Sequence, residues 1–210
     1  MSLFPMFVKL QDRLCVVVGG GEVAEAKIPS LLEAGAKVRV IAPEVTEAIS
    51  AWAKEGRLQW APRRFGPGDL SGAFVVIAAT SAFGVNQDVF HEADAQGILC
   101  NAVDDPERCH FYYPAVVRRG PLQIAISTAG FSPALAQRLR RELKAQFGSE
   151  YEAWLEWLGA VRAAMRAESE NPEETRKILH ALASNEMFEQ FLRASRDSRS
   201  NNSGSNGKVA

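Results

Sequence analysis

A short apolar run that leads directly into closely spaced glycines constrains this chain more than any other feature. Residues 14–18 are apolar, and the chain continues as Gly19-Gly20-Gly21-Glu22-Val23-Ala24. A buried strand followed by a Gly-x-Gly-x-x-Ala turn is typical of sheets that bind a dinucleotide pyrophosphate at the start of the next helix. Gly35 then ends that helix, and residues 36–42 supply a second strand. A glycine-rich turn in an unrelated α/β protein is the alternative, but it does not require this ordered series.

The alternation of strands and helices continues through the first half of the chain. Residues 73–79 form a continuous apolar run, as a parallel strand buried on both faces requires. Thr80 and Ser81 follow it and are expected to cap the next helix. We expect the other strands at 58–60 and 98–103, and helices at 23–34, 44–54 and about 80–96. The pattern predicts an α/β fold, a Rossmann-like doubly wound parallel sheet, over residues 1–112.

The pattern changes after residue 112. Residues 113–148 predict a small α+β segment, with a strand at 122–127 and a helix that begins at Ser132-Pro133. Residues 149–194 predict a C-terminal helical domain in which Asn171 starts the second helix. Residues 195–210 are rich in serine, asparagine and glycine, and we expect a disordered tail there.

Composition excludes several classes of protein. The chain has 24 basic and 25 acidic residues, so no overall charge attracts nucleic acid or a membrane surface. Its three cysteines lack Cys-x-x-Cys spacing, which favours reduced thiols and no metal site. The first residues do not resemble a secretion signal, and no run of eighteen apolar residues occurs. We therefore expect a cytoplasmic protein.

The cofactor contacts are expected where the parallel strands end. They comprise the turn and helix start, Gly19, Gly20, Gly21, Glu22, Val23 and Ala24, together with Pro43 and Thr80 at two further strand ends. The second strand ends in Ala42-Pro43, with Glu44 as the nearest carboxylate and no arginine or lysine following to meet a 2′-phosphate. We therefore expect NAD as the cofactor.

Two further segments carry a resemblance to a known family. Residues 101–114, Asn-Ala-Val-Asp-Asp-Pro-Glu-Arg-Cys-His-Phe-Tyr-Tyr-Pro, and residues 119–142, which include Ile-Ser-Thr-Ala-Gly-Phe-Ser-Pro, resemble the precorrin-2 dehydrogenase family of sirohaem biosynthesis. The likeness runs from about Leu3 to about Leu143. It implies NAD-dependent oxidation of precorrin-2 to sirohydrochlorin, with ferrous iron insertion in some members. It also implies a homodimer in which the middle segment exchanges between subunits.

The resemblance assigns roles to particular residues. An aspartate at the position of Asp104 is tied to the chemistry, and the turn with Ser127, Thr128 and Ser132 lies at the tetrapyrrole site. Two positions depart from the family: Ala129 stands where a glycine is usual, and Ala26 replaces an arginine beside Lys27.

The residues themselves fit this chemistry. Asp104 follows a strand at its carboxyl end, where it can act as a base or charge partner, although Asp104-Asp105-Pro106 can also be a simple turn. The substrate carries eight carboxylates in this family, and we expect a cationic cluster near the serine-rich turn, formed by Arg118, Arg119, Arg138 and Arg141. His110 is either a helper in metal insertion or a packed or surface histidine.

Two other functions compete with this interpretation. A non-catalytic NAD-sensing module would keep an acid at the end of the second strand, where this chain has Ala42. A generic dehydrogenase would need an acid–base residue in its helical region, which offers only Lys177 and His180. No residue decides whether iron or another metal is inserted.

Overall fold

The computed structural model describes residues 3–169 and 171–203 of the chain. Contacts divide the protein into two compact units, residues 4–113 and the residues from Pro114 onward. The further boundary that we expect near residue 148 stays a prediction.

The first unit is an α/β sandwich around a five-stranded parallel sheet in the order β3-β2-β1-β4-β5. In chain order its elements are β1 (Leu14–Val18), α1 (Glu22–Glu33), β2 (Lys37–Ile41), α2 (Glu47–Lys54), β3 (Gln59–Ala61), β4 (Val75–Ala78), α3 (Phe83–Ala95), β5 (Leu99–Ala102) and the short 3-10 helix η1 (Pro106–Arg108). The predicted doubly wound parallel sheet is confirmed.

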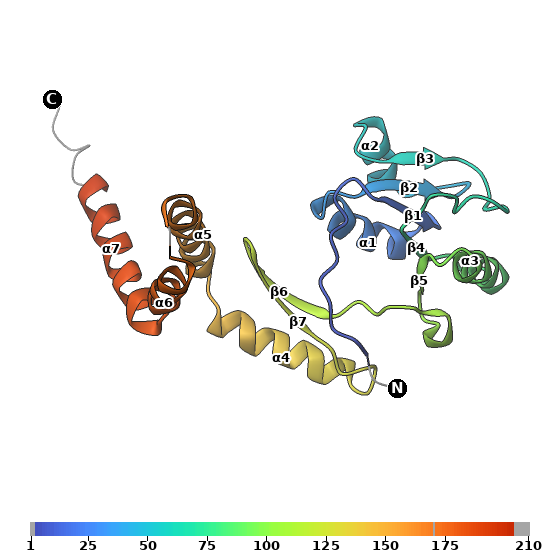
Figure 1. Ribbon diagram of the computed structural model, residues 1–210. Coiled ribbons are helices and arrows are strands. Elements are labelled where there is room, and N and C mark those ends of the chain that lie inside the picture. Colours follow the sequence, from blue (N-terminus) through green and yellow to red (C-terminus); the bar gives the residue numbers. More distant parts are fainter. Residues whose placement is uncertain (1–2, 170, 204–210) are drawn as a thin grey trace, which may run out of the picture. The chain divides into compact units, whose positions relative to one another are not determined.

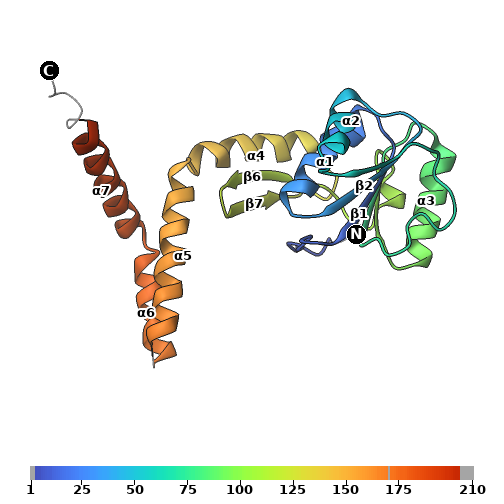
Figure 2. The same cartoon turned by 90° about the horizontal axis from the view of Figure 1, so that it is seen from above.

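Side chains of β1 alternate between two hydrophobic cores. Cys15 and Val17 pack with α1 and α2, whereas Val16 and Val18 pack with α3 on the opposite face of the sheet. Figure 2 shows these helices on the two sides of the strands. All four side chains are buried, which explains why the central strands are continuously apolar rather than alternating.

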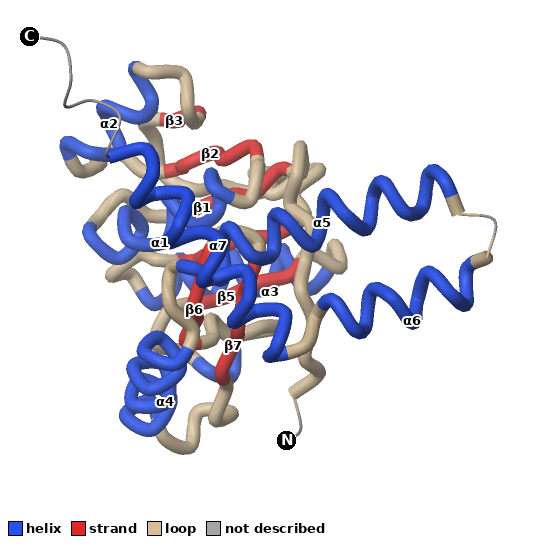
Figure 3. The backbone as a smooth tube through the Cα atoms, turned by 90° about the vertical axis from the view of Figure 1, so that its left-hand side faces the viewer, coloured by secondary structure: helices blue, strands red, loops and turns tan. Residues whose placement is uncertain are grey.

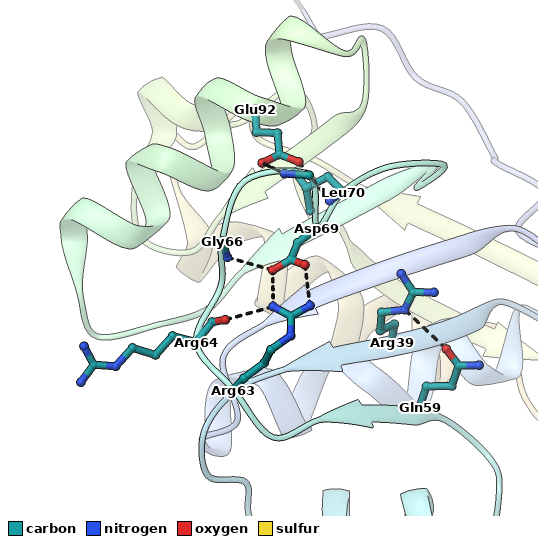
Figure 4. Close-up of polar contacts among 9 residues, drawn as sticks. Arg39, Gln59, Arg63, Arg64, Gly66, Asp69, Leu70 and Glu92 are labelled. Atoms are coloured by element: carbon teal, nitrogen blue, oxygen red, sulfur yellow. Dashed lines mark hydrogen bonds and ion pairs between the residues drawn. The ribbon is translucent and has the colours of Figure 1, made fainter.

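The connection between β3 and β4 crosses the sheet without a helix. Leu70 from this connection is fully buried in the core on the α3 side. Arg63 donates two hydrogen bonds to Asp69, of 2.7 and 2.6 Å, and Asp69 also accepts one from the Gly66 amide. Glu92 of α3 accepts from two further amides of the connection, those of Gly68 and Leu70 (Figure 4). Side-chain carboxylates therefore satisfy the backbone that a helix would satisfy internally.

The second unit begins with an antiparallel hairpin. β6 (Ala115–Arg119) pairs with β7 (Leu122–Ile126), and α4 (Pro133–Gln146) packs along them (Figure 1). Arg119 closes one end of this arrangement, because its guanidinium donates to the carbonyl oxygens of Lys144 and Phe147 at the end of α4, at 2.9 and 2.8 Å.

Three helices follow, α5 (Glu150–Glu168), α6 (Pro172–Leu182) and α7 (Asn185–Ser203). α5 and α6 lie side by side (Figure 3). Trp154 is the buried centre of an aromatic cluster, with Trp157 stacked at 5.0 Å between ring centroids and Phe188 and Phe191 against it. The tryptophans therefore serve to pack α5 against α7.

Several expected boundaries were wrong. β6 was not predicted, and Ser184 divides the last predicted helix into α6 and α7. Residues 195–203, expected to be disordered, continue α7, because no glycine or proline interrupts the chain there. The rest of the expected tail, residues 204–210, lies outside the described residues. Within the described chain, the search for a helix long and apolar enough to cross a membrane finds none.

The Arg63–Asp69 pair yields a prediction about acid stability. The hydrogen bond from Arg63 holds the pKa of Asp69 below its usual value. Its contribution to stability is therefore complete above the unfolded-state pKa of about 4 and is lost as the pH falls through the lower folded-state value. We expect Asp69→Asn to lower the free energy of unfolding at pH 7 by about 1–2 kcal/mol and to flatten its dependence on pH below about 4.

Urea unfolding between pH 2.5 and 7 measures this effect. Glu55→Gln is the matched control because Glu55 and Arg57 form a solvent-exposed ion pair. We expect this substitution to change the free energy of unfolding by less than about 0.5 kcal/mol. Equal stability of Asp69→Asn and the wild type at pH 7 would contradict the structural role of the pair.

Candidate functional site

The order in which the chain adds strands to the sheet reverses between β1 and β4. β1 pairs with β2 on one side and with β4 on the other, so the chain that follows β1 and the chain that follows β4 leave from adjacent strand ends. Such a switch point at the carboxyl edge of an open parallel sheet is where ligands of this fold class bind. It also aligns the predicted residues, since Pro43, the glycine turn, Thr80 and Asp104 follow β2, β1, β4 and β5 in that spatial order.

The three glycines of the turn have different surroundings. Gly19 has a φ of +119°, and a Cβ atom there would collide with the backbone of Ala79. A Cβ at Gly20 would collide with the carbonyl oxygen of Glu44, whereas one at Gly21 would meet no described heavy atom within 4 Å. Gly19 and Gly20 are therefore required by packing, and the absence of a side chain at Gly21 keeps the helix start open to a ligand.

The two helices at the switch point begin without a side-chain cap. Gly21 precedes α1 and Ala82 precedes α3, and in neither case does a side chain among the described residues accept a hydrogen bond from the first turn. By contrast, Thr46 caps α2. The first amides of a helix have no intrahelical acceptor, so Glu22, Val23 and Ala24 present N–H groups and the positive end of the helix dipole to an anion. These features fit a dinucleotide pyrophosphate.

Thr80 does not cap α3, contrary to expectation. Its hydroxyl donates to Oδ1 of Asn86 at 2.7 Å, and Nδ2 of Asn86 donates back to the Thr80 carbonyl oxygen at 3.0 Å. Asn86 is only 8% exposed, so this exchange fixes the loop between β4 and α3. Sequence reasoning missed Asn86, and an asparagine inside an otherwise apolar helix face was the signal that pointed to it.

Asp104 and Asp105 have different environments. Asp105 forms a 2.6 Å ion pair with Arg108, whereas the carboxylate of Asp104 is exposed and has no partner within the described residues. Asp104 also has a φ of +61°, an uncommon conformation that places it directly after β5. Strained residues of this kind cluster at functional sites. The structure therefore leaves Asp104 available for a ligand and uses Asp105 to hold η1.

His110 is held by the protein. Its Nδ1 lies 3.1 Å from the Cys100 amide and 3.2 Å from the Ile98 carbonyl oxygen, and its Nε2 lies 3.2 Å from Asp94. These contacts fix the orientation of the His110 ring, although the residue itself is exposed.

Burial affects the two cysteine thiols near His110. Burial raises the pKa of Cys100 to about 12, and burial also raises the pKa of Cys109, so both are protonated at neutral pH. Among residues 3–169 and 171–203, no three His, Cys, Asp or Glu side chains gather to bind a metal ion.

The serine-rich turn is organised by its own hydroxyl groups. Ser127 Oγ accepts from the Ala129 amide, Thr128 Oγ1 accepts from the Ser132 amide, and Ser132 Oγ caps α4 through the Leu135 amide, at 3.1, 3.3 and 3.2 Å. Each hydroxyl keeps its own hydrogen for donation to a ligand. Ala129 has a φ of +50°, which explains why the resembling family usually has a glycine there.

The expected cluster of four arginines is not formed within the second unit. Arg118 pairs with Gln123 near the hairpin tip, four residues of extended chain, or about 13 Å, from Ser127. Arg119 is committed to the end of α4. Arg138 lies in the second turn of α4, where it pairs with Glu142 at 3.3 Å, and Arg141 is exposed one turn further on. The prediction of one cluster was wrong because the length of β7 separates Arg118, near the hairpin tip, from the serine-rich turn before α4.

Comparisons with known protein families agree with this arrangement. Residues 6–115 match the family described as putative NAD(P)-binding, and residues 119–146 match the family described as sirohaem biosynthesis protein, central. The second match covers β7 and α4 together with the turn between them.

Individual relatives show the same likeness. Siroheme synthase 2 of Yersinia enterocolitica is 38% identical over 192 residues, which is 91% of this chain and 41% of that protein. Siroheme synthase 1 of Aeromonas salmonicida is 37% identical with the same coverage. This chain thus spans about two fifths of the length of these relatives. The solved structure of SirC, precorrin-2 dehydrogenase, superposes with a TM-score of 0.79 at 26% identity, over 93% of this chain and 100% of that one.

Because both the NAD(P)-binding and the sirohaem biosynthesis models match in order, and a dehydrogenase of the same architecture superposes along nearly the whole chain, the protein belongs to the precorrin-2 dehydrogenase and sirohaem synthase family.

Proposed function

We propose that this protein oxidises precorrin-2 to sirohydrochlorin with NAD as the hydride acceptor. The observation that carries the proposal is the order of groups along the carboxyl edge of the sheet. The glycine turn lies on one side of β4, and on the other lies Asp104, an acid with no partner among the described residues. A sensing module needs the first of these groups but has no use for the second. The comparison with SirC supports the same reaction.

The residues present fit a dinucleotide. The amides of Glu22, Val23 and Ala24 would hold its pyrophosphate, and Pro43 would lie beside the adenosine ribose at the end of β2. Thr80 would then lie near the nicotinamide half, because β4 is on the other side of β1. When bound, NAD supplies a hydride acceptor.

Asp104 is the proposed acid–base residue. Oxidation of precorrin-2 releases one hydride equivalent and one proton, so a carboxylate close to the ring is needed to accept the proton. The exposed Asp104 side chain has no ion-pair or hydrogen-bond partner in the described chain that would compete for that proton. Asp105 cannot serve equally well because Arg108 holds its carboxylate.

The start of α4 is the proposed site for substrate carboxylates. The hydroxyl groups of Ser127, Thr128 and Ser132 can donate hydrogen bonds, and the helix dipole favours negative charge there. Arg138 is the predicted cation on the same helix, and Arg118 remains a predicted contact at the hairpin tip.

Insertion of ferrous iron is the second proposed activity. The relatives are named siroheme synthases, and sirohaem contains iron. Removal of the two pyrrole N–H protons needs a proton acceptor, a role that the exposed Asp104 carboxylate could also fill. Iron is a substrate of this step and not a resident cofactor.

A homodimer is the proposed assembly. Phe131 and Leu135 at the start of α4 are 90% and 38% exposed, and a two-stranded hairpin covered by one helix has little stability by itself. Pairing of this segment with a second copy would cover both side chains.

Substitutions at two glycines of the turn distinguish an effect on nucleotide binding from an effect on folding. Gly21→Val adds a side chain to open space with a backbone that any residue adopts, so the free energy of unfolding should change by less than about 1 kcal/mol. The same side chain occupies the proposed pyrophosphate position, and we expect the NADH dissociation constant to rise at least about tenfold. Gly19→Ala should instead destabilise the protein by about 1–3 kcal/mol, because of its positive φ. Fluorescence titration and urea unfolding measure both; unchanged NADH affinity in Gly21→Val would contradict the site.

Replacement of Asp104 tests the chemistry. Asp104→Asn is suitable because asparagine tolerates a positive φ. We expect the rate of NAD-dependent precorrin-2 oxidation, followed by sirohydrochlorin absorbance, to fall about 10²–10⁴-fold with NADH affinity within about twofold of wild type. A later addition of Fe²⁺ to sirohydrochlorin measures iron insertion with the same variant.

Asp105→Asn is the matched control. It breaks the ion pair with Arg108, so it should reduce stability and leave the oxidation rate within about threefold. Wild-type oxidation by Asp104→Asn would refute the proposed role of that residue.

The proposed dimer makes a separate prediction. At micromolar concentration the protein should sediment as a species of twice its 22.9 kDa mass. Phe131→Asp should raise the dimer dissociation constant at least about tenfold, whereas Ile178→Asp, at an exposed position on α6, should not. Sedimentation of the wild type as a monomer would exclude the assembly.

A further inference from the structure

The end of β2 offers few groups to the 2′ position of an adenosine ribose. Ala42 is buried, and its backbone is tied to β3, since its N–H donates to the Ala61 carbonyl oxygen at 3.2 Å and its own carbonyl oxygen accepts from Trp60 Nε1 at 2.9 Å. Pro43 has no N–H group. Glu44 is the first residue after the strand with a charged side chain, and it is exposed.

The sheet brings two cations to this place from further along the chain. Ile41 of β2 is in register with Ala61 of β3, so both strands end at the same edge. Arg63 and Arg64 follow Ala61 within three residues, and the Arg63 amide donates back to the Ala61 carbonyl oxygen at 2.8 Å. The Cα atom of Arg64 therefore lies within about 10 Å of the end of β3. No arginine follows β2 directly, but Arg63 and Arg64 reach the same edge of the sheet from the end of β3.

The guanidinium groups of Arg63 and Arg64 differ in their hydrogen bonds. Arg63 is committed to Asp69, and its guanidinium also donates to the Arg64 carbonyl oxygen at 3.1 Å, which fixes the backbone of Arg64. The Arg64 side chain is exposed and extends away from Asp69 (Figure 4). Within the part of the chain that the structure describes, its guanidinium has no hydrogen-bond or ion-pair partner. A fixed backbone that carries an unpaired guanidinium is well suited to bind a phosphate group.

We propose that the cofactor site also accepts NADP and that Arg64 binds the adenosine 2′-phosphate, an inference that rests on the proposed nucleotide site. The 2′-hydroxyl of NAD does not require the guanidinium, so NAD binding is retained. Glu44 opposes the phosphate by its charge, and the balance between Glu44 and Arg64 sets the preference for one dinucleotide over the other.

Binding measurements on the full chain test the proposal without reference to catalysis. Fluorescence titration gives the dissociation constants of NADH and NADPH, and calorimetry with 2′,5′-ADP and 5′-ADP isolates the adenosine end. In the wild type we expect NADPH to bind within about tenfold of NADH. Arg64→Gln should weaken NADPH and 2′,5′-ADP by about 10–100-fold and change NADH and 5′-ADP by less than about twofold. Glu44→Gln should strengthen NADPH binding alone.

Arg57→Gln is the matched control, because Arg57 is an exposed arginine that precedes β3 and so lies at the opposite edge of the sheet. It should alter none of the four constants. The unfolding temperature of Arg64→Gln should equal that of the wild type, since its guanidinium contacts no described partner. The proposal is overturned if Arg64→Gln weakens both dinucleotides equally or neither, or if wild-type protein binds NADH but binds NADPH more than about a hundredfold more weakly. Binding of neither dinucleotide by the wild type would refute the proposed function itself.

Discussion

The parallel pairing of β1 with both β2 and β4 is the constraint on which the rest of the first unit depends. Four buried residues, Cys15 to Val18, pair with both neighbouring strands, and their side chains supply both cores. Because the chain reverses direction across the sheet at this strand, α1 and α3 start from adjacent strand ends on opposite faces. The glycine turn, Thr80 and Asp104 are neighbours for that reason alone, although more than eighty residues separate the first from the last.

The polar groups near this edge fall into two sets. Asn86, Asn101, His110 and Arg63 have their hydrogen bonds satisfied within the protein, and each fixes a loop that a ligand would otherwise have to order. The first amides of α1, the Asp104 carboxylate and the Arg64 guanidinium are not used in this way in the described chain. Ordering a loop on binding costs free energy, and the first set of groups has already ordered these loops. The second set stays exposed to solvent and can pair with a charged ligand without leaving a buried polar group unsatisfied.

The sequence predicted the first unit well because its evidence is local. Buried parallel strands read as apolar runs, and Gly35 and Gly97 end helices by adopting positive φ. β6 was missed because Ala115 to Arg119 contains two adjacent arginines, and the strand forms only through its pairing with β7. Thr80 was assigned to the wrong partner because its bond to Asn86 depends on the loop between them. The roles of Arg63 and Arg64 could not be predicted, since only the register of β3 against β2 shows that the chain after Ala61 leaves from the same sheet edge as Pro43.

The central claim is that a dinucleotide and an acid meet at one sheet edge. The most direct measurement is a crystal structure of the protein with NAD bound. The account predicts density for the pyrophosphate on the amides of Glu22, Val23 and Ala24, with the nicotinamide on the side of β1 that carries β4 and β5, and the Asp104 carboxylate facing the same space. A dinucleotide bound away from the glycine turn, or an Asp104 side chain directed away from the nicotinamide, would contradict it.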